Sequence, residues 1–236
     1  MADFLMPKNQ NLVVQRYDYR MTFEKKGRAR YISHLDLMRA MQRAFKRAGI
    51  PLWYTQGFNP HAYLNFPLAL ALGIESSIEV LDVSLTEEMD FDEVTERLNK
   101  VMPEGIRIIK TGKPIKKHTE IFFAEYTVKF SCSGKTSEQV TELFNDLLNK
   151  ETIEIEKRTK KKGIKLVDIK PHLNVKSIKA IDNDFVEIEI KLPAGCEFNL
   201  NVSSVIDAFC KYKNVQIENI YTTRTKIGCK DGEDFI

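Results

Sequence analysis

His34 and His61 are candidates for proton transfer, because an imidazole changes its charge near neutral pH. His34 lies in the segment YISHLDLMR and His61 in the segment QGFNPH. If the fold brings them together, one can act as a general base on a ribose 2′-hydroxyl and the other as an acid on the leaving oxygen. The alternative for either histidine alone is a capping or hydrogen-bonding role. The pair therefore defines a candidate catalytic site for metal-independent cleavage of RNA.

Residues 54–66, YTQGFNPHAYLNF, combine aromatic rings with amide, glycine and proline residues. Aromatic rings interleaved with basic and amide side chains suit single-stranded nucleic acid, because rings stack on bases while arginines contact phosphates. The alternative is that these rings close the end of a hydrophobic core. The candidate nucleic-acid-binding residues are Arg28, Arg30, His34, Arg39, Arg43, Tyr54, Gln56, Phe58, Asn59, His61 and Tyr63.

Charge is strongly segregated along the chain, although the 236 residues carry a net charge of only +3. Residues 25–73 contain eight Lys or Arg and one acid, whereas residues 75–104 contain ten acids. Further basic runs lie at 113–118 and 157–165. Such runs are usually solvated faces, but this degree of segregation favours a polyanionic partner. RNA is the polyanion that the aromatic segment suits.

The sequence contains no recognisable metal or cofactor motif. Cys132, Cys196, Cys210 and Cys229 are far apart and form no CxxC or CxxxCxxC cluster, so we expect no metal and no cofactor on this chain. No stretch approaches the roughly 20 apolar residues of a membrane span. The N-terminus lacks the pattern of a signal peptide, so we expect a cytoplasmic protein without a membrane partner.

The order of predicted elements in the first half is β-α-β-β-α-β, the ferredoxin-like unit. Ser33 is a good N-cap, the residues after it have helical periodicity, and Gly49 is a stop signal. The predicted strands are 17–24, 50–54, 77–86 and 106–112, and the predicted helices are about 34–48 and 90–102.

The same order repeats in the second half, offset by about 109 residues, which indicates a duplication. There, 152–159 corresponds to the second strand of the first half. We therefore predict an α+β protein of two tandem ferredoxin-like domains with antiparallel sheets, residues 1–114 and 115–236.

In such a unit, three connections lie on one edge of the sheet. In the first half these are residues 25–34, 55–76 and 102–105. That edge would gather the arginines, both histidines and the aromatic segment beside the N-terminus of the first helix, which is a favourable place for an anion.

The stretch from KKGRARYISHLDLMR through RAGIPL and QGFNPH to LNKVMPEGI resembles the signature of the radical SAM-linked, or radical SAM-associated, family of uncharacterised bacterial proteins. The second half matches more loosely. The resemblance implies a radical SAM partner, often one with a cobalamin-binding domain. S-adenosylmethionine and the iron–sulfur cluster would then belong to that partner.

Three hypotheses about function follow. The favoured one is an RNA-binding accessory module that presents structured RNA to a radical SAM enzyme. The second is a metal-independent endoribonuclease, which the tandem architecture and His34 make similar to CRISPR repeat-processing enzymes at the level of the fold alone. The third is a protein–protein adaptor that uses the GFNPH segment.

Overall fold

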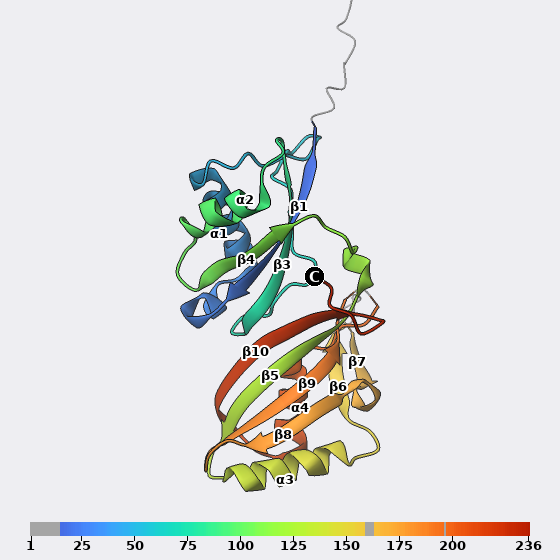
Figure 1. Cartoon of the computed structure of the whole chain (residues 1–236). Helices are drawn as coiled ribbons and strands as arrows, with labels where there is room; N and C mark the ends of the chain where they lie inside the picture. Colours follow the sequence, from blue (N-terminus) through green and yellow to red (C-terminus); the bar gives the residue numbers. More distant parts are fainter. Residues whose placement is uncertain (1–14, 159–162, 196) are drawn as a thin grey trace, which may run out of the picture.

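The computed structural model describes residues 15–158, 163–195 and 197–236, so Cys196 and part of the basic run 157–165 lie outside the described residues. Within these ranges the chain has a mixed α/β fold, with four α-helices and one large, mostly antiparallel sheet (Figure 1).

The elements follow the chain in two successive groups. The first group comprises β1 (Tyr17–Lys25), the 3₁₀ helix η1 (Gly27–Tyr31), α1 (His34–Arg47), β2 (Leu64–Asn65), β3 (Glu75–Leu85), α2 (Phe91–Asn99) and β4 (Ile106–Gly112). The second comprises η2 (His118–Glu120), β5 (Ile121–Cys132), α3 (Ser137–Leu148), β6 (Glu154–Arg158), β7 (Ile164–Asp168), η3 (Lys170–His172), β8 (Asn174–Ala180), β9 (Phe185–Pro193), α4 (Val202–Lys213) and β10 (Ile217–Cys229).

One sheet runs through both halves of the chain. Its strand order is β4-β1-β3-β10-β5-β9-β8, and β2 also pairs with β3. The β3–β10 pair is parallel and joins Thr223 to Glu75 and Arg224 to Ser76, while the other pairs in this sheet are antiparallel. The expectation of two separate antiparallel sheets is therefore corrected, because β10 pairs with a strand of the first half.

The predicted second strand of each half is also corrected. Within 50–54 only isolated bridges form, from Leu52 and Tyr54. The two-residue strand β2 pairs with β3 in place of the predicted strand. In the second half, β6 covers part of the predicted strand 152–159 but pairs with β7 and not with β9. The partners of β9 are β5 and β8. The amide of Ile169 donates to the carbonyl of Ile153 at 2.8 Å, so these buried residues close a separate β6–β7 hairpin.

Local sequence signals explain α1 well. Ser33 is the N-cap as predicted, and its Oγ accepts a hydrogen bond from the amide of Asp36 at 3.2 Å. Leu37 and Phe45 are among the residues that α1 buries. Gly49 follows the helix with φ +64°, the left-handed conformation that favours glycine.

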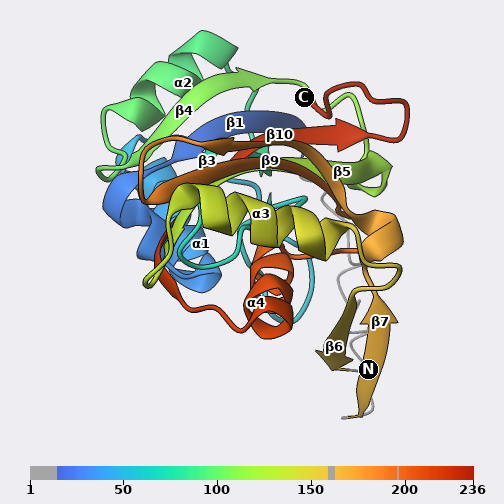
Figure 2. The same ribbon diagram turned by 90° about the horizontal axis from the view of Figure 1, so that it is seen from below.

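Two hydrophobic cores stabilise the fold. One lies between β1, β3 and β4 and the helices α1 and α2, and the other between the strands of the second half and α3 and α4. Figure 2 shows α3 and α4 together on one side of β5 and β9, with the β6–β7 hairpin projecting from the body. Leu68, Leu70, Ile74 and Val80 come from the first half but pack in the second core. The domain boundary near residue 114 stays a prediction.

A buried ion pair lies where β3 meets β10. Arg224 Nη1 donates to Glu79 Oε1 at 3.0 Å, and each side chain is only 2% exposed. Arg224 also donates to the carbonyls of Leu68 and Ala69, at 3.1 and 3.0 Å. Burial raises the pKa of Glu79, and the charges of Arg224 and the buried Lys25 oppose that shift. Through Arg224, the cluster therefore holds β10 and the segment that contains Leu68 and Ala69 against β3.

We expect Glu79→Ala to lower the free energy of unfolding by about 3–5 kcal/mol, because Arg224 would stay buried without its counter-charge. Urea denaturation followed by circular dichroism measures the change. Glu156→Ala is the control, because it removes only an exposed pair with Lys211 at 3.6 Å, and we expect little change. Equal losses in the two variants would contradict a structural role for the buried pair.

Candidate nucleic-acid interface

The sequence-predicted site residues divide between the two ends of β3. Arg30 Nη1 lies 3.5 Å from Oε1 of Glu75, the first residue of β3. At the other end, the amide of Trp53 donates to the carbonyl of Ser84 at 2.8 Å. Because β3 runs from Glu75 to Leu85, the two ends are roughly 30 Å apart at about 3.3 Å per residue.

The expected convergence on one edge is therefore correct only in part. Residues 25–34 do meet 102–105, since the amide of Lys26 donates to the carbonyl of Gly105 at 2.8 Å. The connection 55–76 is not a single loop, however, because β2 pairs with β3 in the middle of it. Residues before β2 consequently lie at one end of β3 and residues after it at the other.

Aromatic and basic side chains form a continuous row where the two halves meet. The Arg30 guanidinium carbon lies 4.8 Å from the ring centre of Tyr31 and 5.5 Å from that of Tyr221. The Tyr221 ring lies 6.3 Å from the Phe185 ring, and Lys129 Nζ lies 4.6 Å from the same Phe185 ring. We call these five residues the junction strip.

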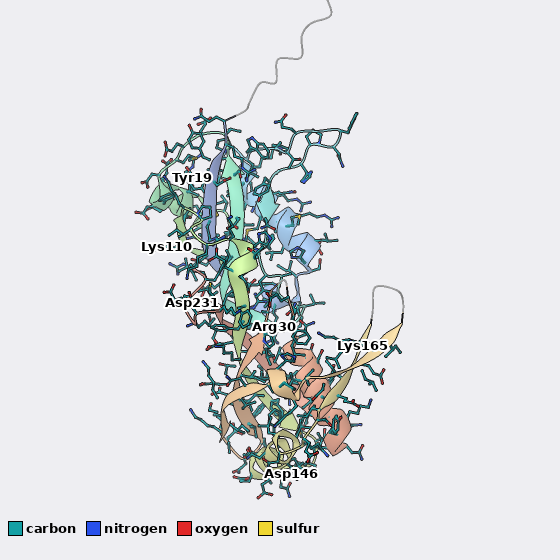
Figure 3. The ribbon with its side chains drawn as sticks, turned by 90° about the vertical axis from the view of Figure 1, so that its right-hand side faces the viewer. Tyr19, Arg30, Lys110, Asp146, Lys165 and Asp231 are labelled. Atoms are coloured by element: carbon teal, nitrogen blue, oxygen red, sulfur yellow. The ribbon has the colours of Figure 1, made fainter. Side chains whose placement is uncertain are left out.

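The two tyrosines of the junction strip are open to solvent, whereas its other three residues, Arg30, Lys129 and Phe185, are only partly exposed. Tyr31 is 63% exposed and Tyr221 is 46% exposed. Figure 3 shows Arg30 midway along the molecule, between the ends marked by Tyr19 and Asp146. The strip combines residues from η1, β5, β9 and β10, so both halves of the chain contribute to it.

Arg30 retains an unused hydrogen-bond donor within this strip. Its Nη2 donates to the Tyr31 hydroxyl at 2.8 Å, but its buried Nε has no hydrogen-bond partner among the described residues. Glu75 is the acid beside it, and the Glu75 carboxylate also accepts from the amide of Gly27 at 3.1 Å. Arg28, on the same short helix η1, is exposed. At this end of β3, the Glu75 carboxylate is thus shared between Arg30 and the Gly27 amide, and Arg28 lies exposed nearby on η1.

The N-terminus of α1 is a poor anion site, contrary to expectation. The Asp36 carboxylate lies in the first turn, and Oδ2 accepts from the Ser33 hydroxyl at 2.8 Å. Hydrogen bonds from Ser33 and Arg39 lower the pKa of Asp36. A carboxylate that stays charged here repels a phosphate. It also forms an ion pair with Arg39, whose Nη1 lies 3.1 Å from Asp36 Oδ1. Arg43 is exposed on the same helix.

Residues 53–63 form a second feature, which we call the aromatic hairpin. Tyr54 bridges Ala62, and the amide of Tyr63 donates to the carbonyl of Trp53 at 3.0 Å. At the base, Arg16 stacks on both Trp53 and Tyr63, with its guanidinium carbon 5.0 and 4.4 Å from the ring centres. The hairpin is therefore held at the end of the sheet remote from the junction strip.

The two candidate catalytic histidines are not paired. His34 packs edge-on against Phe66, with ring centres 5.1 Å apart. His61 Nδ1 lies 3.1 Å from Thr55 Oγ1 and 3.2 Å from the carbonyl of Asn59, inside the aromatic hairpin. About five residues of mostly extended chain lie between His61 and Phe66, and they span roughly 15 Å. Because His34 packs against Phe66, this length also separates His61 from His34. The geometry does not bring the two imidazoles together for acid–base catalysis.

The model of the family described as uncharacterized protein conserved in bacteria (DUF2344) matches residues 18–210. The chain belongs to this family. The match begins in β1 and extends into α4, so it includes both the aromatic hairpin and η1. The family description names no reaction and no partner, so the link to radical SAM proteins rests on the resemblance alone.

Other comparisons add little. Among curated proteins none matches this chain. An unknown protein from Galdieria sulphuraria has a TM-score of 0.26 at 10% identity, over 87% of this chain and 98% of its own. A candidate glycine cleavage system transcriptional repressor has a TM-score of 0.24 at 12% identity, over 89% of this chain and 98% of its own. Scores this low support no inference about this protein.

Sequence reasoning missed several members of the junction strip. Tyr221, Phe185 and Lys129 lie in the second half, where no candidate was chosen. One signal was present: the strands of the second half alternate, and β9 buries every other residue. The residues that β9 leaves unburied, Phe185 included, form the face away from α3 and α4.

In the described part of the chain, no group of His, Cys, Asp or Glu side chains is arranged to hold a metal ion. Cys132, Cys210 and Cys229 are free thiols, and burial raises the pKa of Cys132 to about 11. No described helix has the length and apolar character needed to cross a membrane.

We expect Thr55→Val to loosen the aromatic hairpin without unfolding the protein. Thr55 Oγ1 accepts from the His61 amide at 3.1 Å, and valine cannot replace that acceptor. Hydrogen exchange should show faster exchange of the His61 amide than in the wild-type protein. Thr119→Val, at an exposed threonine elsewhere, is the control. Unchanged exchange at His61 would show that backbone bonds alone hold the hairpin.

Proposed function

We propose that this protein binds single-stranded RNA along the junction strip. The observation that supports this most directly is the Arg30 guanidinium, whose carbon lies 4.8 Å from the ring centre of Tyr31 and 5.5 Å from that of Tyr221. An arginine between exposed rings offers a phosphate contact beside two stacking surfaces. Arg30 was a candidate from the sequence, and Arg28 lies on the same short helix.

The strip suits a single strand better than a duplex. Tyr31, Tyr221 and Phe185 supply ring faces, and only unpaired bases can be splayed out to stack on such rings. Arg30 and Lys129 supply positive charge along the row, and Arg28 lies exposed on the same short helix as Arg30. Glu187 pairs in register with Lys129, so this part of the sheet is less basic than the η1 end. The backbone of the RNA would therefore run close to η1.

We also propose that each half of the chain is a ferredoxin-like unit. The order β4-β1-β3-β2 in the first half and β10-β5-β9-β8 in the second supports this, since each has its fourth strand beside its first. One sheet face of such a unit is free of helices. In the second half this face carries Phe185 and Tyr221, which is the kind of surface used by RNA-binding sheets.

The radical SAM partner belongs to the same proposal. Its support is the resemblance of the motifs from Tyr31 to His61, which implies an accessory module working with an enzyme that carries S-adenosylmethionine and the iron–sulfur cluster. In this scheme the present chain holds the RNA, and the partner performs the chemistry.

We expect Tyr221→Ala to weaken binding of a fluorescein-labelled single-stranded RNA of about 12 nucleotides by about tenfold or more, because one stacking face is worth about 1–3 kcal/mol. Fluorescence anisotropy at about 50 and about 200 mM salt measures this affinity. Arg30→Gln should reduce the slope of log affinity against log salt by about 1, because one phosphate contact is lost.

Tyr54→Ala is the matched control, because Tyr54 is a similarly exposed tyrosine, 53% against 46% for Tyr221, on the aromatic hairpin. We expect Tyr54→Ala to bind the RNA as the wild-type protein does. The proposal would be overturned if wild-type binding showed no salt dependence, or if the two tyrosine variants lost affinity equally.

A further inference from the structure

A small cavity lies on the face of the first half of the sheet that carries no helix. Met21 and Phe23 of β1 are buried in the core with α1 and α2, so Arg20 and Thr22, which alternate with them, face the opposite way. The connection that leaves β4 and the C-terminal residues cover this face in place of a helix. Both Figure 1 and Figure 2 show the C-terminus close to that connection.

The charged side chains that line this cavity are all positive. Four cations contribute to the lining, namely Arg20, Lys110, Lys113 and Lys116, and no Asp or Glu side chain does. Lys116 is already paired with Glu233 at 2.9 Å. Within the described residues, the side chains of Lys110 and Lys113 form no ion pair and no hydrogen bond. Two positive charges therefore remain unbalanced at the cavity, and they favour an anion.

Arg20 is the most firmly held of these cations. It is 6% exposed, and the Asp82 carboxylate accepts from its Nε at 2.7 Å and from its Nη2 at 2.9 Å. Its guanidinium carbon lies 4.3 Å from the ring centre of the buried Phe235. No described residue accepts a hydrogen bond from the third nitrogen, Nη1. This N–H donor stays available on a side chain that is already ordered, so its use by a ligand costs little further entropy.

The size and the walls of the cavity define the kind of anion. Its volume is about 280 Å³, slightly below the roughly 300–1,000 Å³ of typical ligand pockets, so it suits a small molecule. Phe235, Ile115 and Ile236 supply apolar walls. A phosphate is best held by a helix N-terminus or an unpaired arginine, and neither lines this cavity. Lysines beside apolar walls match a carboxylate that carries an apolar body.

We propose that this cavity binds a small organic carboxylate. Its head group would contact Lys110, Lys113 and Nη1 of Arg20, and its apolar body would lie against Phe235 and the other apolar walls. The cavity shares no residue with the junction strip. The proposal therefore does not depend on RNA binding, and either proposal can fail alone.

Octanoate is the probe, titrated into the ¹⁵N-labelled full chain while amide chemical shifts are followed. We expect saturable shifts centred on Gly112 and Phe235, which line the cavity. Acetate lacks the apolar body, octanol lacks the charge and octylammonium has the opposite charge, so each should bind weaker by about tenfold or more. Octanol binding as tightly as octanoate, shifts centred elsewhere, or no saturable shift with octanoate would overturn the proposal.

A double variant tests the two unbalanced charges. Lys110→Gln combined with Lys113→Gln should weaken octanoate binding by about tenfold or more, because the charged contacts are lost. Both side chains are exposed, and the amide spectrum reports that the variant keeps its fold. Lys46→Gln combined with Lys179→Gln is the matched control, because it removes two exposed lysines that do not line the cavity. Equal octanoate affinity in the two double variants would overturn the proposal.

A substitution in the apolar wall gives a second test. Ile115 is 91% exposed, so its replacement leaves the core intact. Ile115→Asp places a like charge beside the bound carboxylate and should weaken octanoate binding by about tenfold. Ile115→Leu should bind octanoate as the wild type does. Octanoate binding that is unchanged in Ile115→Asp would contradict the assignment of the cavity.

Labelled RNA separates this site from the RNA proposal. The Lys110 and Lys113 double variant should bind the RNA oligonucleotide as the Lys46 and Lys179 control does, because both have the same net charge. A greater loss of RNA affinity in the cavity variant would assign these two lysines to RNA and overturn their role in carboxylate binding.

Discussion

The arrangement of this molecule depends on the ion pair between Glu79 and Arg224. Only two residue pairs join β3 to β10, which is a short contact on which to join two halves of a chain. The buried pair reinforces that contact, since Arg224 also holds the carbonyls of Leu68 and Ala69. Loss of either charge would leave the other buried without its counter-charge, so the pair favours this arrangement of the two halves.

The junction strip is a consequence of how the two halves of the chain meet at β3 and β10. Tyr221 lies three residues before Arg224 on β10, and Glu75, which pairs with Arg30, lies four residues before Glu79 on β3. Fixing Arg224 against Glu79 therefore brings Tyr221 to Arg30. Neither half alone has both the arginine and the second ring, so the strip exists only in the assembled sheet.

The aromatic hairpin is positioned by different forces. Its base is stacked on Arg16, and its backbone bonds extend from the C-terminal end of β3. No residue of the second half takes part in these contacts. The molecule thus has one surface created by joining its halves and another built by local structure.

The sequence by itself determined the local elements and much of the candidate chemistry. The Ser33 cap, α1, α2 and most long strands follow from periodicity and capping, because these signals act between residues that are close in the chain. Arg30 and the exposed rings of residues 54–58 could also be recognised by type. Tertiary structure alone decided which residues meet: a two-residue β2 sends His61 away from His34, and one parallel strand pair brings Tyr221 to Arg30. These pairings depend on burial and on contacts between residues far apart in the chain, for which a single sequence carries no local signal.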